Sequence, residues 1–205
     1  MTVHDRYDDL IARLAARAHE RCALLPDPVP PRDLAAAEER LGFALHPLLA
    51  RLYTEIADGG FGPDDRFFPL DGPAGDPGAL VAGYAARRSA DPGGPGWFWP
   101  EGVVPLLTWG SEMIAAVDCR SAEGTVVLFD PNEADHDWAN AWFKDADGLA
   151  GWLETSLAGT GWYADPDADD WGDLDAAVSD DQLQSVELDR WGAQARARAG
   201  TPAAV

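Results

Sequence analysis

Hydrophobic residues recur at helical spacing through the first quarter of the chain. Between residues 5 and 25, apolar side chains return every three or four positions with charged ones between them, which predicts an amphipathic helix. The prolines within 26–31 cannot continue that helix. A second helix is predicted over 32–41, where Gly42 ends it, and a third begins at Pro47.

Helical spacing gives way to short β-prone runs after residue 66. The run Phe67–Leu70 predicts a short strand or an edge segment, and Pro69 favours the edge because it has no N–H to donate to a second neighbour. Residues 71–96 are rich in Gly, Pro and Asp and predict a long surface loop with one helical turn around 79–87. Three further runs are joined by connectors short enough for hairpins and predict an antiparallel meander: Val103–Trp109, Met113–Cys119 and Thr125–Asp130.

A short strand at 141–143 and a helix over about 146–158 follow the meander. Asp145 or Asp147 is in position to cap this helix. The apolar spacing is also compatible with a helix over 182–198. N-terminal helices, a small antiparallel sheet and a closing helix together predict an α+β fold.

Acidic residues dominate the composition and gather in the second half of the chain. The 36 Asp and Glu residues outnumber the 15 Lys and Arg residues, which gives a net charge of −21. Residues 165–189 contain ten acids and no Lys or Arg. Such a field repels nucleic acid and anionic membranes and favours a basic partner. Two interpretations of 165–189 stay open: a solvated acidic tail, and an electrostatic lure for a basic protein.

The sequence carries no recognisable motif for catalysis, metal binding or cofactor binding. Its four histidines lie far apart, and the acids that follow residue 164 lack the Gly and Glu that a calcium loop requires. Gly-rich nucleotide loops and the GxSxG nucleophile frame are also missing. We therefore expect a non-enzymatic chain without metal or cofactor. The isolated Cys22 and Cys119, and the lack of a membrane-length apolar run, indicate the cytoplasm.

The chain has nine tryptophans, each of which can serve either in core packing or in partner binding. Trp109 and Trp152 fit the core patterns of a strand and a helix. Six others lie among Gly, Pro and Asp and fit equally well as interface anchors or as cover for a small core: Trp97, Trp99, Trp138, Trp162, Trp171 and Trp191.

A set of short motifs lies between residues 27 and 158. The chain reads Glu38-x-x-Leu41-Gly42-x-x-Leu45-x-Pro47, then Leu49-x-x-Leu52-Tyr53, then Asp58-Gly59-Gly60-Phe61. Strand-like segments follow at Phe68-Pro69-Leu70, Val104-Pro105-Leu106, Trp109-Gly110, Val117-Asp118 and Val126–Asp130. This set resembles the SUKH superfamily of the Smi/Knr type, which reads E-x-x-L-G-x-x-L-P, an aromatic-bearing helix and N-G-G. His46 splits the Leu-Pro pair and Asp58 replaces Asn, which still tolerates the turn.

The resemblance implies an α+β domain without catalytic residues, here at 1–160, followed by an acidic, Trp-containing extension at 161–205. Bacterial members resemble immunity proteins that neutralise toxins, often nucleases, of polymorphic toxin systems, and fungal relatives are cell-wall assembly regulators. A nuclease binds phosphates and is usually basic, so an acidic inhibitor suits it. We therefore expect a cytoplasmic bacterial immunity protein that blocks a basic toxin domain.

The expected contact surface is the sheet with its loops. Trp109 and Trp138 are expected to anchor the partner, and four acids are expected to supply charge: Asp130, Glu133, Asp135 and Asp137. Asp58-Gly59-Gly60 is expected to shape a turn rather than to touch a partner. Two other functions stay open. One is an interaction scaffold or regulator that docks through 161–205, and the other is a hydrolase of unrecognised type.

Overall fold

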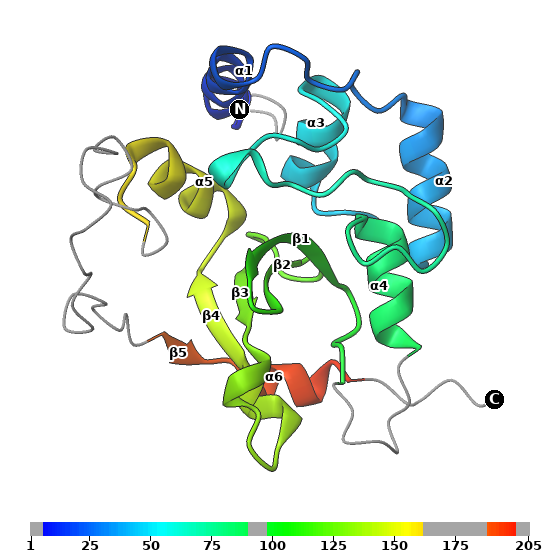
Figure 1. Ribbon diagram of the computed structural model, residues 1–205, viewed down its shortest axis with the longest axis vertical. Coiled ribbons are helices and arrows are strands. Elements are labelled where there is room, and N and C mark those ends of the chain that lie inside the picture. The colour runs from blue at the N-terminus through cyan, green and yellow to red at the C-terminus, as the bar shows by residue number, and fades with distance from the viewer. Residues whose placement is uncertain (1–5, 90–97, 162–187, 200–205) are drawn as a thin grey trace, which may run out of the picture.

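The computed structural model describes residues 6–89, 98–161 and 188–199 (Figure 1). One antiparallel sheet runs in the order β1-β2-β3-β4-β5 and consists of Val103–Gly110, Met113–Asp118, Val126–Phe129, Trp142–Ala146 and Asp189–Arg190. The helices α1 to α6 are Asp8–Arg21, Pro31–Leu41, Pro47–Glu55, Leu80–Arg88, Leu149–Ala158 and Gly192–Ala197. Short 3₁₀ turns η1, η2 and η3 lie at Pro63–Asp65, Pro131–Glu133 and Trp138–Ala141. The predicted α+β class is confirmed.

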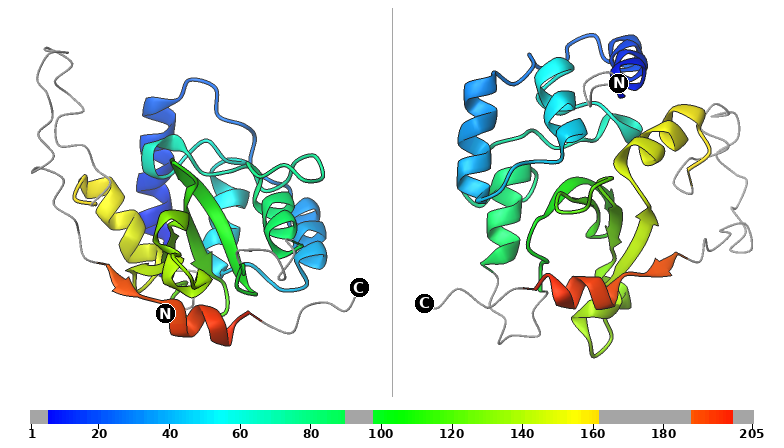
Figure 2. Two further views of the ribbon diagram at one scale, coloured as in Figure 1. Left: turned by 60° about the horizontal axis from the view of Figure 1, so that its bottom comes forward. Right: turned by 180° about the vertical axis from the view of Figure 1, so that it is seen from behind.

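The sheet is curled, and the helices are distributed unevenly around it. In Figure 1, α1 to α5 form an arc over the top and both flanks of the sheet, whereas α6 runs across the opposite end beside β5 (see also Figure 2). The strands follow one another in chain order, so each is paired with its sequence neighbour among the described elements. The predicted meander is therefore confirmed. The strand expected at 141–143 is present as β4, and β5 is an additional strand.

The N-terminal helices begin and end close to the predicted positions. Both α2 and α3 start with proline in the first turn, and Gly42 ends α2 with a φ of +80°. His46 caps α3, because its Nδ1 accepts a hydrogen bond from the Leu48 N–H at 3.3 Å. The apolar faces of these helices are buried in the core, as the spacing of their residues predicts.

The turn Asp58-Gly59-Gly60 connects α3 to the segment that follows. Asp58 accepts a hydrogen bond from the Leu70 N–H at 2.7 Å. Gly59 has a φ of +81°, and a β-carbon there would lie 2.7 Å from the nitrogen of Pro69. Only glycine fits so close an approach of two backbone segments. The contacts of this motif are thus structural.

One row of side chains crosses four strands on the same face of the sheet. Thr108, Ile114, Phe129 and Trp142 are paired in register from β1 to β4, so their side chains point the same way. Trp99 covers the end of this row, with its ring centroid 5.5 Å from Phe129 and 4.9 Å from Trp142. This face therefore carries an aromatic cluster.

The other face of the sheet packs against α5. Trp109 follows Thr108 in β1, and its ring centroid lies 6.4 Å from that of Trp152 in α5. Strands covered on both faces need apolar residues at successive positions, which explains why β1 to β3 lack a strict polar alternation.

Phe67–Leu70 forms no strand but lies as a segment along β1, an edge strand of the sheet, so the edge alternative holds. The Phe68 N–H donates to the Leu106 carbonyl at 2.7 Å, so the segment touches β1. Pro69 and Pro105 lack the N–H groups that would extend this contact into a ladder.

The surface loop expected over 71–96 contains a full helix, α4, where one turn was expected near 79–87. Leu80 and Val81 of α4 are buried, and Tyr84 packs edge-on against Phe43 with ring centroids 5.5 Å apart. Residues 90–97 of the loop lie outside the described residues.

The closing helix α5 begins at Leu149, and its cap position is Gly148 rather than Asp145 or Asp147. Asp145 instead accepts a hydrogen bond from Nε1 of Trp152 at 2.9 Å. Asp147 pairs with Lys144 at 3.0 Å. Both carboxylates have partners that local spacing does not reveal.

Residues 188–199 return to the sheet. β5 pairs with β4, and the buried ring of Trp191 lies 6.1 Å from that of Trp142. The helix expected over 182–198 is present only as α6: Asp189–Arg190 form a strand instead, and 182–187 lie outside the described residues. Trp99 and Trp191 are thus packing residues, whereas Trp97, Trp162 and Trp171 lie outside the described residues.

Candidate binding site

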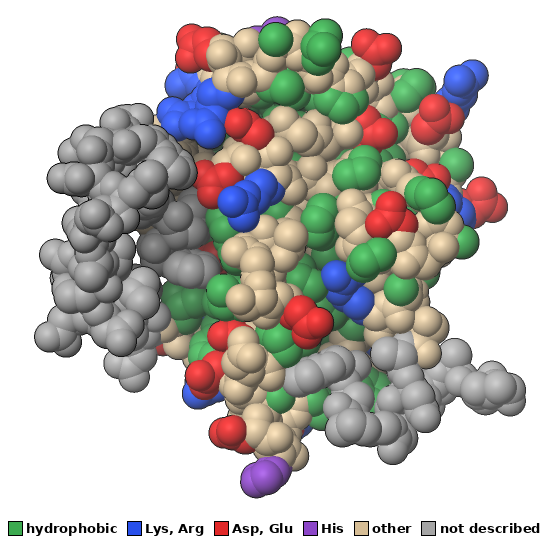
Figure 3. Space-filling view, in the orientation of Figure 1, with side chains coloured by type: hydrophobic (Ala, Val, Ile, Leu, Met, Phe, Trp, Pro, Cys, Tyr) green, Lys and Arg blue, Asp and Glu red, His purple; other side chains and the backbone are tan. Residues whose placement is uncertain are grey.

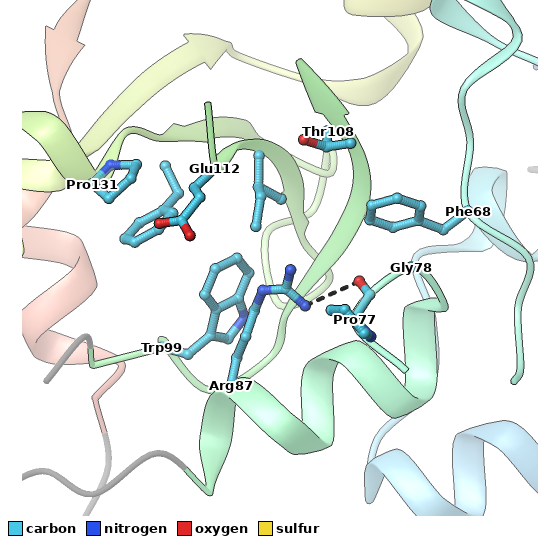
Figure 4. A pocket seen from close by; sticks show the side chains of 10 residues that line it. Phe68, Pro77, Gly78, Arg87, Trp99, Thr108, Glu112 and Pro131 are labelled. Atoms are coloured by element: carbon cyan, nitrogen blue, oxygen red, sulfur yellow. Dashed lines mark hydrogen bonds between the residues drawn. The ribbon is translucent and has the colours of Figure 1, made fainter. Parts of the chain in front are cut away.

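A cavity of about 450 Å³ opens on the face of the sheet that carries the aromatic cluster (Figure 4). Strands β1 to β3 and the turn after β3 form one wall, α4 and the loop before it form another, and Trp99 forms the floor between them. Its lining is mostly apolar, with two charged side chains: Phe68, Pro77, Gly78, Arg87, Trp99, Thr108, Glu112, Ile114, Phe129 and Pro131. This size and this mixture of groups are typical of sites for small ligands or single side chains.

Arg87 reaches into the cavity from the last turn of α4 (Figure 4). Its guanidinium lies 5.1 Å from the ring centroid of Trp99, and Nη1 donates to the carbonyls of Gly83 at 3.0 Å and Pro77 at 3.4 Å. Burial lowers the pKa of this guanidinium from its ordinary value. The aromatic face and two carbonyls hold the cation in a fixed place while its other donors face the cavity.

Glu112 faces the same cavity from the hairpin between β1 and β2. Gly110 pairs with Met113, so the turn has two central residues, Ser111 and Glu112. Their φ angles are +47° and +65°. A type I′ hairpin needs positive φ at both positions and strongly favours Asn-Gly there, so these two residues are strained.

A second feature adjoins the cavity at Pro131. The chain from 130 to 138, called the acidic segment below, joins β3 to η3 and projects from the end of the sheet. In Figure 3, acidic side chains gather on this projection at the lower end of the view. The structure brings together five of the six residues that the sequence nominated: Asp130, Glu133, Asp135, Asp137 and Trp138.

Several side chains of the acidic segment already have partners. Asp130 and Asp137 cap η2 and η3 by accepting hydrogen bonds from backbone N–H groups at 3.0 and 3.1 Å. Glu133 pairs with Arg190 at 3.3 Å, and Asp137 also pairs with Arg196. Asp135 is exposed and has a φ of +45°.

The two nominated tryptophans occupy different surroundings. Trp138 is half-buried, and its ring centroid lies 5.4 Å from that of Phe98. Trp109 is half-buried on the other face of the sheet, against Trp152. The six nominated residues therefore do not form one surface, because Trp109 is separated from the acidic segment by the sheet.

The cysteine and histidine side chains packed inside the fold, Cys119 and His46, have structural roles. Burial raises the pKa of the Cys119 thiol to about 12, so this cysteine stays protonated at neutral pH. His46 uses both ring nitrogens, since Nδ1 accepts from Leu48 and Nε2 lies 3.2 Å from the carbonyl of Ala122. Within residues 6–89, 98–161 and 188–199, His, Cys, Asp and Glu form no group of three suited to a metal ion.

Of the cavity residues, the sequence singled out only Trp99, as one of six tryptophans that fit either as interface anchors or as cover for the core. Phe68, Arg87, Trp99 and Glu112 come from four separate segments, and their convergence depends on the tertiary fold. One local signal existed: the tight connector Gly110-Ser111-Glu112 lacks the residues that a two-residue hairpin favours.

The fold defines an α+β protein in which helices precede and follow an antiparallel meander. The family described as SMI1 / KNR4 family (SUKH-1) matches residues 28–155, and the chain belongs to this family. The resemblance inferred from the motifs of 27–158 is confirmed. A comparison with curated proteins gave no match. The segment 188–199, which completes the sheet, lies outside the matched range.

None of the helices within the described ranges is long and apolar enough to cross a membrane.

Proposed function

We propose that the chain is a cytoplasmic, non-catalytic immunity protein that binds and neutralises a basic, nuclease-like toxin domain. The observation that carries this proposal is the acidic segment, a projecting run of carboxylates at the open end of the sheet. Membership of the SUKH-1 family supports it, because bacterial members resemble immunity proteins of polymorphic toxin systems.

Electrostatics supports a basic partner. The chain carries a net charge of −21, which draws a cationic protein in and accelerates its encounter. Asp135 is exposed, whereas Glu133 and Asp137 are paired with Arg190 and Arg196. These arginines are themselves exposed, and a cationic partner competes with them for the same carboxylates. Exposed pairs of this kind contribute little to stability, so their exchange costs little.

Contact area in this proposal comes from the half-buried ring of Trp138 beside the acids. An aromatic ring framed by charged groups is a common anchor at protein interfaces. Trp109 is not included in the proposed surface, because it packs against Trp152 on the other face of the sheet.

The test is co-expression with basic toxin domains taken from genes that neighbour the gene for this chain. The proposal predicts a complex that co-purifies and growth that is rescued. A toxin that still kills in the presence of the folded chain would contradict the proposal. A second arm uses a chain in which the acids of 165–187 are replaced by Asn and Gln, which keeps β5 and α6 in place. Immunity through the folded domain survives this change, whereas a scaffold that docks through the extension loses its partner.

A further inference from the structure

Arg87 is an exception among the cations of this chain. Twelve of the fifteen Lys and Arg residues form an ion pair with a carboxylate within the described ranges. Of the other three, Arg17 is exposed, and Arg88 donates to the carbonyls of Trp99 and Ala199. Arg87 instead points into an apolar cavity and has no carboxylate within 4.0 Å in the described part of the chain. Burial of a cation without a carboxylate partner is unfavourable, and an anionic group of a ligand would supply the missing charge.

Glu112 is the one acidic side chain among the described residues that line the cavity. It projects over the same cavity from a strained hairpin position with a φ of +65°, and no ion pair joins it to Arg87. Glu112 is exposed, and its place in the hairpin brings its carboxylate to the opening of the cavity. Arg87 stays away from it because Trp99 and the carbonyls of Gly83 and Pro77 hold the guanidinium. The cavity lining thus combines one cation and one carboxylate with apolar side chains (Figure 4).

We propose that this cavity binds a free α-amino acid with a large apolar side chain. The ligand carboxylate pairs with the unused donors of Arg87, and the ligand ammonium pairs with Glu112. The side chain of the ligand packs among Trp99, Ile114 and Phe129. A zwitterion satisfies both charges at once, and its zero net charge spares it the repulsion that the acidic protein exerts on a simple anion.

The cavity dimensions agree with this ligand class. A volume of about 450 Å³ lies in the lower range of small-ligand sites, in which a few polar groups orient an apolar body. Arginine suits the carboxylate end because its planar fork binds both oxygens of a carboxylate. The proposal does not depend on the proposed immunity function, since it concerns a small molecule and not the toxin.

The experiment is isothermal titration of the full chain with L-phenylalanine and three analogues. 3-Phenylpropanoic acid lacks the ammonium group, 2-phenylethylamine lacks the carboxylate, and N-acetyl-L-phenylalanine imitates a peptide C-terminus. L-Phenylalanine is expected to bind at least about tenfold more tightly than each analogue, because each analogue leaves one protein charge unpaired.

Two variants test which protein side chain pairs with which charged group of the ligand. Arg87→Gln is expected to abolish the preference for L-phenylalanine over 2-phenylethylamine. Glu112→Gln is expected to abolish the preference for L-phenylalanine over 3-phenylpropanoic acid. Arg17→Gln, which changes the net charge as Arg87→Gln does, is expected to leave all affinities unchanged. Thermal unfolding of each variant verifies the fold.

Three results would overturn the assignment. They are the absence of binding of L-phenylalanine, L-leucine and L-tryptophan at about 10 mM, equal binding of N-acetyl-L-phenylalanine, and affinities that Arg87→Gln leaves unchanged. A chain that neutralises its toxin but binds no amino acid would overturn this inference alone.

Discussion

Arg198 lies 2.7 Å from the carboxylate of Asp118, whose side chain is only 2% exposed. This ion pair joins the end of β2 to the residue after α6, and the Arg198 carbonyl also accepts the N–H of Glu101. Asp118 is one of two buried polar or charged side chains in the described ranges, and His46 is the other. Residues 188–199 therefore supply a core charge with its counter-ion.

Replacing Arg198 by Gln is expected to lower the free energy of unfolding by about 2–4 kcal/mol, because it leaves a buried carboxylate without its cation. Chemical denaturation at pH 7 measures this loss. The double variant D118N/R198Q is expected to recover most of it, since the buried charge is then absent. An R198Q chain as stable as the unmodified one would contradict a supporting role for 188–199.

The same ion pair predicts a pH dependence. Burial raises the pKa of Asp118 above its ordinary value, so the folded state takes up this proton at a higher pH than the unfolded chain does. The stability contribution of the group therefore falls as pH rises through that window. Without Arg198 the pKa rises further. The difference in stability between R198Q and the unmodified chain is expected to shrink as the pH is lowered towards about 4.

His46 predicts a dependence of the opposite sign. Burial lowers its pKa below 6.5, so the unfolded chain takes up the proton first as the pH falls. The contribution of neutral His46 to the free energy of unfolding is fully present above about pH 6.5. It is lost as the pH falls towards the pKa of His46 in the folded state. Protonation also removes the Nδ1 acceptor that caps α3. Denaturation at pH 7.5 and 5.5 is expected to show a smaller loss in His46→Asn, because Asn caps a helix without titrating; an equal loss in both chains would count against this origin.

The hairpin Ser111-Glu112 predicts a substitution that stabilises the protein. S111N/E112G supplies the residues that a type I′ turn favours and is expected to add about 1–3 kcal/mol to the free energy of unfolding. The control S111A/E112A removes the same side chains but keeps the positive φ strain, so no gain is expected. Thermal and chemical unfolding compare the two variants. A gain in both would show that side-chain repulsion, not backbone strain, is relieved.

The sequence predicted the local elements well and the long-range contacts poorly. Proline at the start of α2 and α3 and Gly42 at the end of α2 are local signals, and these helices were found where expected. The Asp145 and Asp147 caps failed because Trp152 and Lys144 take those carboxylates instead. Local spacing carries no information on such competition.

The candidate site also has one part that the sequence predicts and one part that it does not. The acidic segment is continuous in sequence, so composition revealed it before the fold was known. The cavity remained hidden because Arg87, Trp99 and Glu112 meet only through the packing of α4 against β1. Trp109 was nominated by residue type, but its neighbour in space is Trp152 rather than the acids. Which face a strand residue occupies depends on register, which its type does not give.

Trp191 tests whether the residues after 187 are part of the folded core. Its side chain is 4% exposed and packs on Trp142. Trp191→Ala is expected to cost about 3–5 kcal/mol in the free energy of unfolding, as for other buried aromatic truncations. Gln194→Ala, at an exposed position of the same helix, is the matched control. A loss below about 1 kcal/mol for Trp191→Ala would contradict the packing described above.

The central claim is that the acidic segment captures a basic toxin domain, and its association rate tests this claim most directly. The variant D130N/E133Q/D135N/D137N removes four charges while Asn keeps the cap acceptors and tolerates the positive φ at 135. The control neutralises four acids at the opposite, N-terminal part of the chain: Glu20, Asp27, Asp33 and Glu39.

Stopped-flow mixing with the basic toxin domain that co-expression identifies as the partner measures this rate at low and high salt. We predict that the segment variant associates at least about tenfold more slowly at low salt, that the control changes far less, and that high salt removes the difference. Equal slowing by the two variants would mean that the net charge of the whole protein, and not the acidic segment, accelerates association. Unchanged association of the segment variant would contradict the claim outright.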